Sequence, residues 1–210
     1  MSNEVEIKTI RSDSEFHFKE KGSEFIGLAY NFDSESDIQQ KLNELKKNHY
    51  NATHHCFAYK LKTGEFKYSD DGEPKGSAGI RLFNAINHFD LNDLLIVVIR
   101  YYGGTKLGVG PLGKAYYHAA EGCIKNSRFV KMKKYVSLFI NYEFAHTSLL
   151  HRSLSNFDTK IISEDFTLKP KMEVLIFTEE ELHLKQLLSE QSNGSIHFDE
   201  SNRSLWLKST

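Results

Sequence analysis

The sequence contains little cysteine and little proline: two cysteines and three prolines among 210 residues. The cysteines, Cys56 and Cys123, stand far apart and form no C-x-x-C pair, so the sequence offers no disulfide framework. This use of cysteine is typical of a reducing compartment, and we expect a cytoplasmic protein. Because proline is scarce and no low-complexity tract is present, little room remains for a disordered linker.

Long apolar runs and an excess of one charge are also absent. The longest apolar run, residues 94–99, is far shorter than a membrane span, and residues 1–16 contain no apolar signal core. We therefore expect neither export nor a membrane partner. The net charge is −1, so any affinity for anions must come from a local patch.

Hydrophobic periodicity predicts alternating strands and helices in the first part of the chain. Ser34 with Asp37 resembles a capping box for a helix that carries Ile38, Leu42 and Leu45 on one face. Pro111 suits the first position of a later helix. The predicted strands are 24–32, 52–61 and 93–102, and the other helices are 77–89 and the one after Pro111.

The alternation of predicted strands and helices starts again near residue 134. Thr178 with Glu181 resembles a second capping box, and Asn193–Gly194 closes that helix. The predicted order is β-α-β-β-α-β, which is typical of a ferredoxin-like two-layer α+β unit. We therefore predict two domains, 1–132 and 133–210. The strands are 135–144, 159–168, 171–178 and 195–208, and the helices are 145–157 and 179–191.

Five glycines lie between Gly103 and Gly113 in the stretch RYYGGTKLGVGPLGKAY. The G-x-G-x-x-G pattern at 108–113 does not directly follow its strand, and Arg128 stands where a dinucleotide site needs an acid. The same residues nearly match a phosphate-binding P-loop, but Ala115 replaces the hydroxyl residue that would ligate magnesium. We expect no nucleotide cofactor.

Residues 94–120 contain no acid, and glycines allow successive backbone N–H groups to face one anion. This pattern predicts a site for RNA or another phosphate. A tight turn that only allows close packing explains the glycines equally well, and both interpretations stay open. The candidate phosphate-binding residues are Arg100, Gly103, Gly104, Lys106, Gly108, Gly110 and Lys114.

Two other groups of polar residues allow alternative sites. His54 and Cys56 lie on one face of a strand, but two ligands are too few for zinc unless Cys123 or His118 joins them, so we expect no metal. Three acids lie together in a turn-rich segment: Asp70, Asp71 and Glu73. They fit acid–base catalysis, or a turn ahead of a helix. We favour a third interpretation, in which they face Arg100 and Lys106 across a groove.

Three motifs resemble the IMPACT/YigZ family: ATHHCFAY (52–59), SDDGEPKGSAG (69–79) and VVIRYYGGTKLGVGPLGKAY (97–116). The resemblance covers most of residues 15–125. The second part resembles the family only in pattern and position. Pro111 replaces a glycine of the family, Arg81 replaces a proline, and Lys114 stands where arginine is usual. Because Pro111 has no backbone N–H, it weakens the expected anion site.

The resemblance implies a first domain with the two-layer fold of domain IV of elongation factor G and a ferredoxin-like second domain. It also implies a role in translation or its regulation, with no established catalytic activity. We therefore expect a protein that binds structured RNA or the ribosome through its basic, glycine-rich loop. Two alternatives remain: an enzyme that uses a groove of His54, Asp70, Asp71, Glu73 and Arg100, or a module that binds a translation-related protein.

Overall fold

A computed structural model describes residues 4–209 as a mixed α+β protein with antiparallel sheets, as the sequence predicts. The chain divides into two compact units, and the division falls between Lys131 and Met132. Within the described residues, no helix has both the length and the apolar character needed to cross a membrane. Each unit has its own hydrophobic core.

The first unit contains one antiparallel sheet with strand order β2-β3-β6-β4-β5. The sequence analysis missed β1 and β2, whose short alternating segments come before the first predicted strand. The strands are β1 (Glu6–Ile10), β2 (Ser14–Glu20), β3 (Ser23–Asn31), β4 (His54–Lys60), β5 (Phe66–Ser69) and β6 (Leu94–Tyr101). The helices are α1 (Glu35–Asn48), α2 (Gly79–His88) and α3 (Val109–Asn126).

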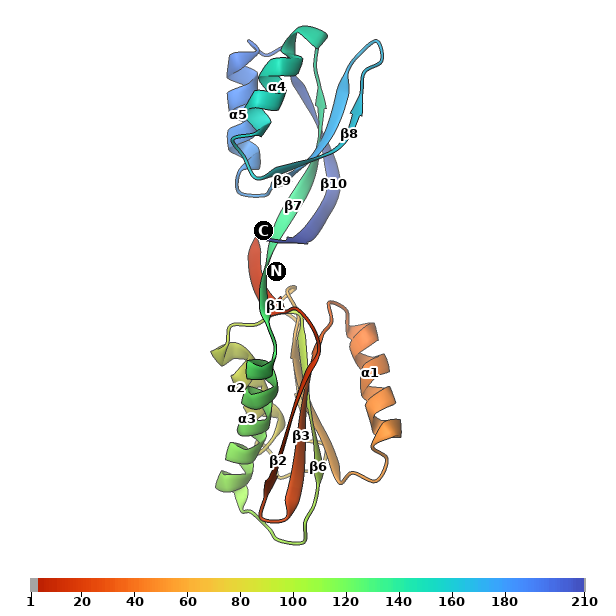
Figure 1. Ribbon diagram of the computed structural model, residues 1–210, viewed down its shortest axis with the longest axis vertical. Coiled ribbons are helices and arrows are strands. Elements are labelled where there is room, and N and C mark those ends of the chain that lie inside the picture. The colour runs from red at the N-terminus through yellow and green to blue at the C-terminus, as the bar shows by residue number, and fades with distance from the viewer. Residues whose placement is uncertain (1–3, 210) are drawn as a thin grey trace. The chain divides into compact units, whose positions relative to one another are not determined.

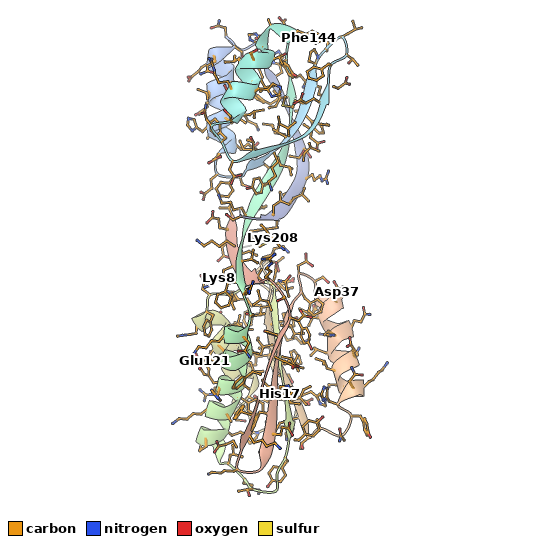
Figure 2. All side chains as sticks on the ribbon, viewed as in Figure 1. Lys8, His17, Asp37, Glu121, Phe144 and Lys208 are labelled. Atoms are coloured by element: carbon orange, nitrogen blue, oxygen red, sulfur yellow. The ribbon has the colours of Figure 1, made fainter. Side chains whose placement is uncertain are left out.

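Helices cover both faces of this sheet (Figure 1). Successive residues of a strand point to opposite faces, so the central strand β6 supplies both cores. Its Leu95, Val97 and Ile99 pack on α1, while the other face of β6 packs on α2 and α3. Figure 2 marks Asp37 on α1 and Glu121 on α3, on opposite sides of the sheet. The first unit therefore has three layers, where the sequence analysis expected two.

The ends of the helices show which capping predictions hold. Ser34 caps α1 and accepts a hydrogen bond from the backbone N–H of Asp37 at 3.3 Å, as predicted. Pro111 is the third residue of α3, because the helix already begins at Val109 after Gly108. The predicted position of Pro111 was therefore wrong by two residues, although it still lies in the first turn, where a missing N–H is tolerated.

The second unit has the predicted order β-α-β-β-α-β and the strand order β10-β7-β9-β8. Its elements are β7 (Phe129–Asn141), a 3-10 turn (Phe144–His146), α4 (Thr147–Leu154), β8 (Thr159–Asp165), β9 (Lys171–Phe177), α5 (Glu181–Gln191) and β10 (His197–Lys208). The second capping box is wrong. Glu180 precedes α5, and the Thr178 hydroxyl instead donates to the backbone oxygen of Lys134 at 2.7 Å.

Gly27 allows α3 to lie directly on the sheet, and its replacement tests this packing. A Cβ at Gly27 would lie 2.4 Å from the backbone oxygen of Ala119, which cannot move without the helix. We expect Gly27→Ala to lower the free energy of unfolding by about 1–3 kcal/mol.

The matched control is Gly110→Ala, because nothing lies within 4 Å of a Cβ built there. We expect this change to alter stability by less than about 1 kcal/mol. Urea unfolding of both variants measures the difference, and equal stabilities would show that close approach is not what requires glycine at position 27.

Candidate functional site

A groove of about 470 Å³ lies in the first unit, at the end of the sheet where β6 finishes and α3 begins. Its polar wall comes from the end of β6 and the beginning of β4, and its apolar wall from the segment leading into α3. The lining residues are Thr53, His54, Glu73, Pro74, Arg100, Tyr102, Lys106, Leu107, Gly108, Val109 and Leu112. The fold thus brings residues of all three sequence motifs, 52–59, 69–79 and 97–116, to one groove.

A buried ion pair forms the floor of this groove. One guanidinium nitrogen of Arg100 lies 2.6 Å from Oε1 of Glu73, and the two side chains are only 5% and 4% exposed. The Tyr116 hydroxyl donates to the same carboxylate oxygen at 2.7 Å. The other terminal nitrogen of Arg100 donates to the Ser23 hydroxyl at 3.2 Å. These bonds compensate for removing both charges from water.

The groups around the ion pair stay protonated. Burial raises the pKa of the Tyr116 hydroxyl far above its ordinary value, so the phenol serves Glu73 as a donor. Burial also raises the pKa of the Cys56 thiol, whose sulfur donates to the backbone oxygen of Asp70 at 3.0 Å. Cys56 is therefore a hydrogen-bonded thiol and not a thiolate nucleophile.

His54 stands beside the ion pair, and its hydrogen bond fixes its tautomer. Its Nδ1 lies 2.8 Å from the backbone oxygen of Asp71, and a carbonyl oxygen can only accept. Nδ1 therefore carries a proton, and in the neutral ring Nε2 is an acceptor. This Nε2 lies 3.7 Å from Oε2 of Glu73, the carboxylate oxygen that receives neither Arg100 nor Tyr116.

The two aspartates of the acidic segment have other tasks. The carboxylate of Asp70 accepts the backbone N–H groups of Gly76, Ala78 and Gly79 at 2.8–3.0 Å and so shapes the turn before α2. The Asp71 carboxylate accepts the N–H of His55 at 2.6 Å and pairs with Lys46. In the described part of the chain, Glu73 alone of the three acids pairs with Arg100, so the expected groove contains Glu73 and not the aspartates.

The glycine-rich stretch does not form one continuous phosphate loop. A Cβ at Gly103 would lie 1.9 Å from a backbone carbon of Gly22, so this glycine allows two loops to touch. Gly104 and Gly108 have positive φ angles of 86° and 87°. Gly110 belongs to α3. The near-match to a P-loop therefore fails in geometry as well as in sequence, because every residue of the motif after Gly108 is already helical and no loop remains to surround a phosphate.

The three predicted cations do not line one common pocket. Arg100 is buried and neutralised by Glu73, so it cannot serve as a surface contact for phosphate. Lys106 is exposed on the groove. Lys114 is exposed on α3 and lines a separate hollow of about 430 Å³ together with Gly110, Arg81, Asn84, Gly113 and Tyr117.

The sequence analysis missed three contributors to these sites: Arg81, Tyr116 and Ser23. Arg81 had a signal, since it replaces a residue that is usual in the similar family. Tyr116 falls in the helix predicted after Pro111, but the periodicity gave no sign that its hydroxyl reaches Glu73. Ser23 had no signal, because its role comes from the approach of two loops: its hydroxyl also accepts the N–H of Gly103 at 3.2 Å.

The two residues that would have to complete a zinc site, His118 and Cys123, have other contacts. The His118 ring packs edge-on against Phe16 and Phe18. The thiol of Cys123 donates to the backbone oxygen of Ala120, and burial raises its pKa to about 12. Among residues 4–209, no group of three or more histidine, cysteine or acidic side chains is arranged to hold a metal ion.

Comparison with known proteins gives consistent matches. The profile of the Impact N-terminal domain matches residues 21–124. The IMPACT family member YvyE of Bacillus subtilis is 31% identical over 163 residues, which are 77% of this chain and 72% of that protein. The IMPACT family member YigZ of Escherichia coli is 26% identical over 180 residues, covering 84% of this chain and 88% of that one.

A eukaryotic relative and a solved structure extend the comparison. The Protein IMPACT homolog of Dictyostelium discoideum is 36% identical over 105 residues, which are 47% of this chain and 29% of that protein. A crystal structure of a hypothetical protein aligns with a TM-score of 0.66 at 22% identity, covering 95% of this chain and 99% of that one. This second similarity concerns the fold.

Removing Arg100 should destabilise the protein, because it leaves the Glu73 carboxylate buried without its cation. We expect Arg100→Met to lower the free energy of unfolding by about 3–5 kcal/mol. The double variant Arg100→Met/Glu73→Gln should be more stable than Arg100→Met alone, because the uncompensated charge is gone. Denaturant unfolding measures the stability of the wild type, the single variant and the double variant. A double variant less stable than Arg100→Met would contradict this account of the pair.

His55 should make stability fall at acidic pH. Burial lowers the pKa of its ring from 6.5, a shift that the nearby Asp71 carboxylate only opposes, and its buried Nε2 has no partner among the described residues. Below pH 6.5 the unfolded chain takes up a proton that the folded ring resists, so stability falls until the pH drops below the folded pKa.

Thermal unfolding between pH 7.5 and 5.5 tests this expectation, with His55→Gln as the comparison. The wild type should lose more stability over this range than the variant, which has no ring to protonate. Equal losses would assign the pH dependence to other groups.

Proposed function

The chain belongs to the IMPACT family, and from this premise we propose that it is a translation-associated regulatory protein that docks on structured RNA, such as that of the ribosome. The contact surface would be the face formed by the loop 102–108, the first turns of α3 and the neighbouring start of α2. We call it the α3 face, and its cations are Lys106, Lys114 and Arg81. No chemical step is part of this proposal.

The observation that carries the proposal is the state of these three cations. All three are exposed, and within residues 4–209 none of them forms an ion pair. Other lysines of the same unit, such as Lys41, Lys46 and Lys62, do have carboxylate partners. Cations without a protein partner are free to meet phosphates.

The start of α3 adds to the attraction for phosphate. The first N–H groups of a helix have no partner within the helix, and the helix dipole favours an anion there. Val109 and Gly110 supply such N–H groups and are exposed, whereas Pro111 supplies none. The proposed surface therefore keeps Lys106, Lys114 and the exposed glycines Gly104, Gly108 and Gly110 from the sequence interpretation, adds Arg81, and leaves out Arg100 and Gly103.

A salt titration of RNA binding tests this function. Lysines that neutralise phosphates release counterions, so affinity should fall steeply as salt rises. The variant Lys106→Ala/Lys114→Ala should bind several structured RNAs more weakly and to a similar degree. Its log–log salt slope should be lower by about two units if each lysine meets one phosphate.

The matched control is Lys41→Ala/Lys47→Ala, which removes the same charge from α1 on the opposite face of the sheet. This control should retain nearly the affinity and slope of the wild type. Equal slopes for the wild type and the α3-face variant would remove this surface as the docking site and would favour a protein partner.

A further inference from the structure

We propose that the groove receives a single unstacked guanine base, carried by the docked RNA or by a free guanine nucleotide. This inference rests on the proposed function, because Lys106 of the α3 face also lies on the rim of the groove. It adds a specificity that the α3 face, which would contact only phosphates, cannot provide.

Two hydrogen-bond acceptors stand next to each other on the polar wall. Oε2 of Glu73 receives neither of the two donors that meet Oε1, and Nε2 of His54, which is an acceptor when the ring is neutral, lies 3.7 Å away from it. Two neighbouring acceptors with no donor between them are poorly satisfied by the protein itself. A ligand that presents two neighbouring N–H donors would satisfy both.

The charge of the wall selects a neutral donor over a cationic one. Arg100 already neutralises Glu73 at 2.6 Å, and Lys106 adds a positive charge at the rim. A guanidinium or ammonium ligand would therefore meet an excess of positive charge. A neutral edge with N–H groups would not, and an anionic group on the same ligand could bind Lys106.

The remaining walls fit a flat apolar ring. Pro74, Leu107, Val109 and Leu112 face the groove, and Tyr102 is 44% exposed at its edge. Proteins hold unstacked bases by stacking on aromatic side chains and by hydrogen bonds to the Watson–Crick edge. A volume of about 470 Å³ lies within the range of sites for small ligands.

Guanine is the common base that carries this donor pattern. Its Watson–Crick edge places the N1–H beside the 2-amino group. Adenine and cytosine place an amino group beside an acceptor nitrogen, and uracil places its single N–H between two carbonyl oxygens. Two acceptors on the protein would thus accept guanine and leave a mismatch with each of the other bases.

The first experiment compares three nucleotides on the full-length protein by calorimetry: guanosine, inosine and adenosine 5′-monophosphates. Inosine lacks only the 2-amino group. We expect guanosine monophosphate to bind about tenfold more tightly than the other two, the discrimination typical of a matched pair of hydrogen bonds. Equal affinities, or no binding of any of them, would remove the free nucleotide as the ligand.

The second experiment uses RNA hairpins that differ in one loop residue, guanosine or inosine. A preference for guanosine together with a steep salt dependence supports both proposals. Salt-dependent binding without preference in either experiment overturns the base site and leaves the docking function standing. A guanine preference only among free nucleotides, with no RNA bound, supports the site and overturns the docking function. If the protein binds neither RNA nor free nucleotides, both the base site and the docking function are overturned.

Two variants connect the preference to the groove. Val109 is 59% exposed, so Val109→Trp should fill the groove without damaging the core and should abolish the preference for guanine. Leu182→Trp is the matched control, because Leu182 is 68% exposed on α5 of the other unit. His54→Phe keeps an aromatic ring but removes both the acceptor and the Nδ1–H that binds Asp71, and its affinities for guanosine and inosine should become similar. A preference that survives both groove variants would contradict the site.

Discussion

The buried ion pair between Glu73 and Arg100 fixes the geometry of the groove. Through this pair and its partners Tyr116 and Ser23, four segments of the first unit meet: the acidic turn, the end of β6, helix α3 and the start of β3. Each hydrogen bond to the pair offsets part of the cost of removing two charges from water. The pair therefore ties the positions of these segments together.

Close packing of two backbone loops also stabilises the surroundings of this ion pair. Gly103 follows β6 and touches Gly22, which places the N–H of Gly103 on the Ser23 hydroxyl that also receives Arg100. The glycines of this stretch thus divide into two kinds. Some allow contact between loops, and others, such as Gly108, allow the turn into a helix. The tight-turn interpretation explains Gly103, whereas it leaves the cations Lys106 and Lys114 unexplained.

The sequence predicted the class of fold and most elements, because long periodic segments such as β6 and α1 carry strong signals. It missed β1, which has five residues, and β2, in which only Phe16 and Phe18 are apolar. It also missed the third layer, because periodicity shows that a face is buried but not which helix covers it. The charges of the groove were visible, but the choice of Glu73 over Asp70 depends on the turn, where the N–H groups of Gly76, Ala78 and Gly79 take up the Asp70 carboxylate. The similarity to elongation factor G stays a prediction.

The charged side chains of this region lie at two different depths in the fold. Arg100 is basic in the sequence, yet inside the fold Glu73 cancels its charge, so the floor of the groove presents acceptors rather than a cation. Lys106 and Lys114, which form no ion pair within residues 4–209, lie outside that floor, at the rim and on α3. Phosphates remain hydrated and are best met at an exposed surface, whereas a base must leave water to enter a groove. A nucleic acid on this surface would therefore keep its backbone at the lysines and could place one base against His54 and Glu73.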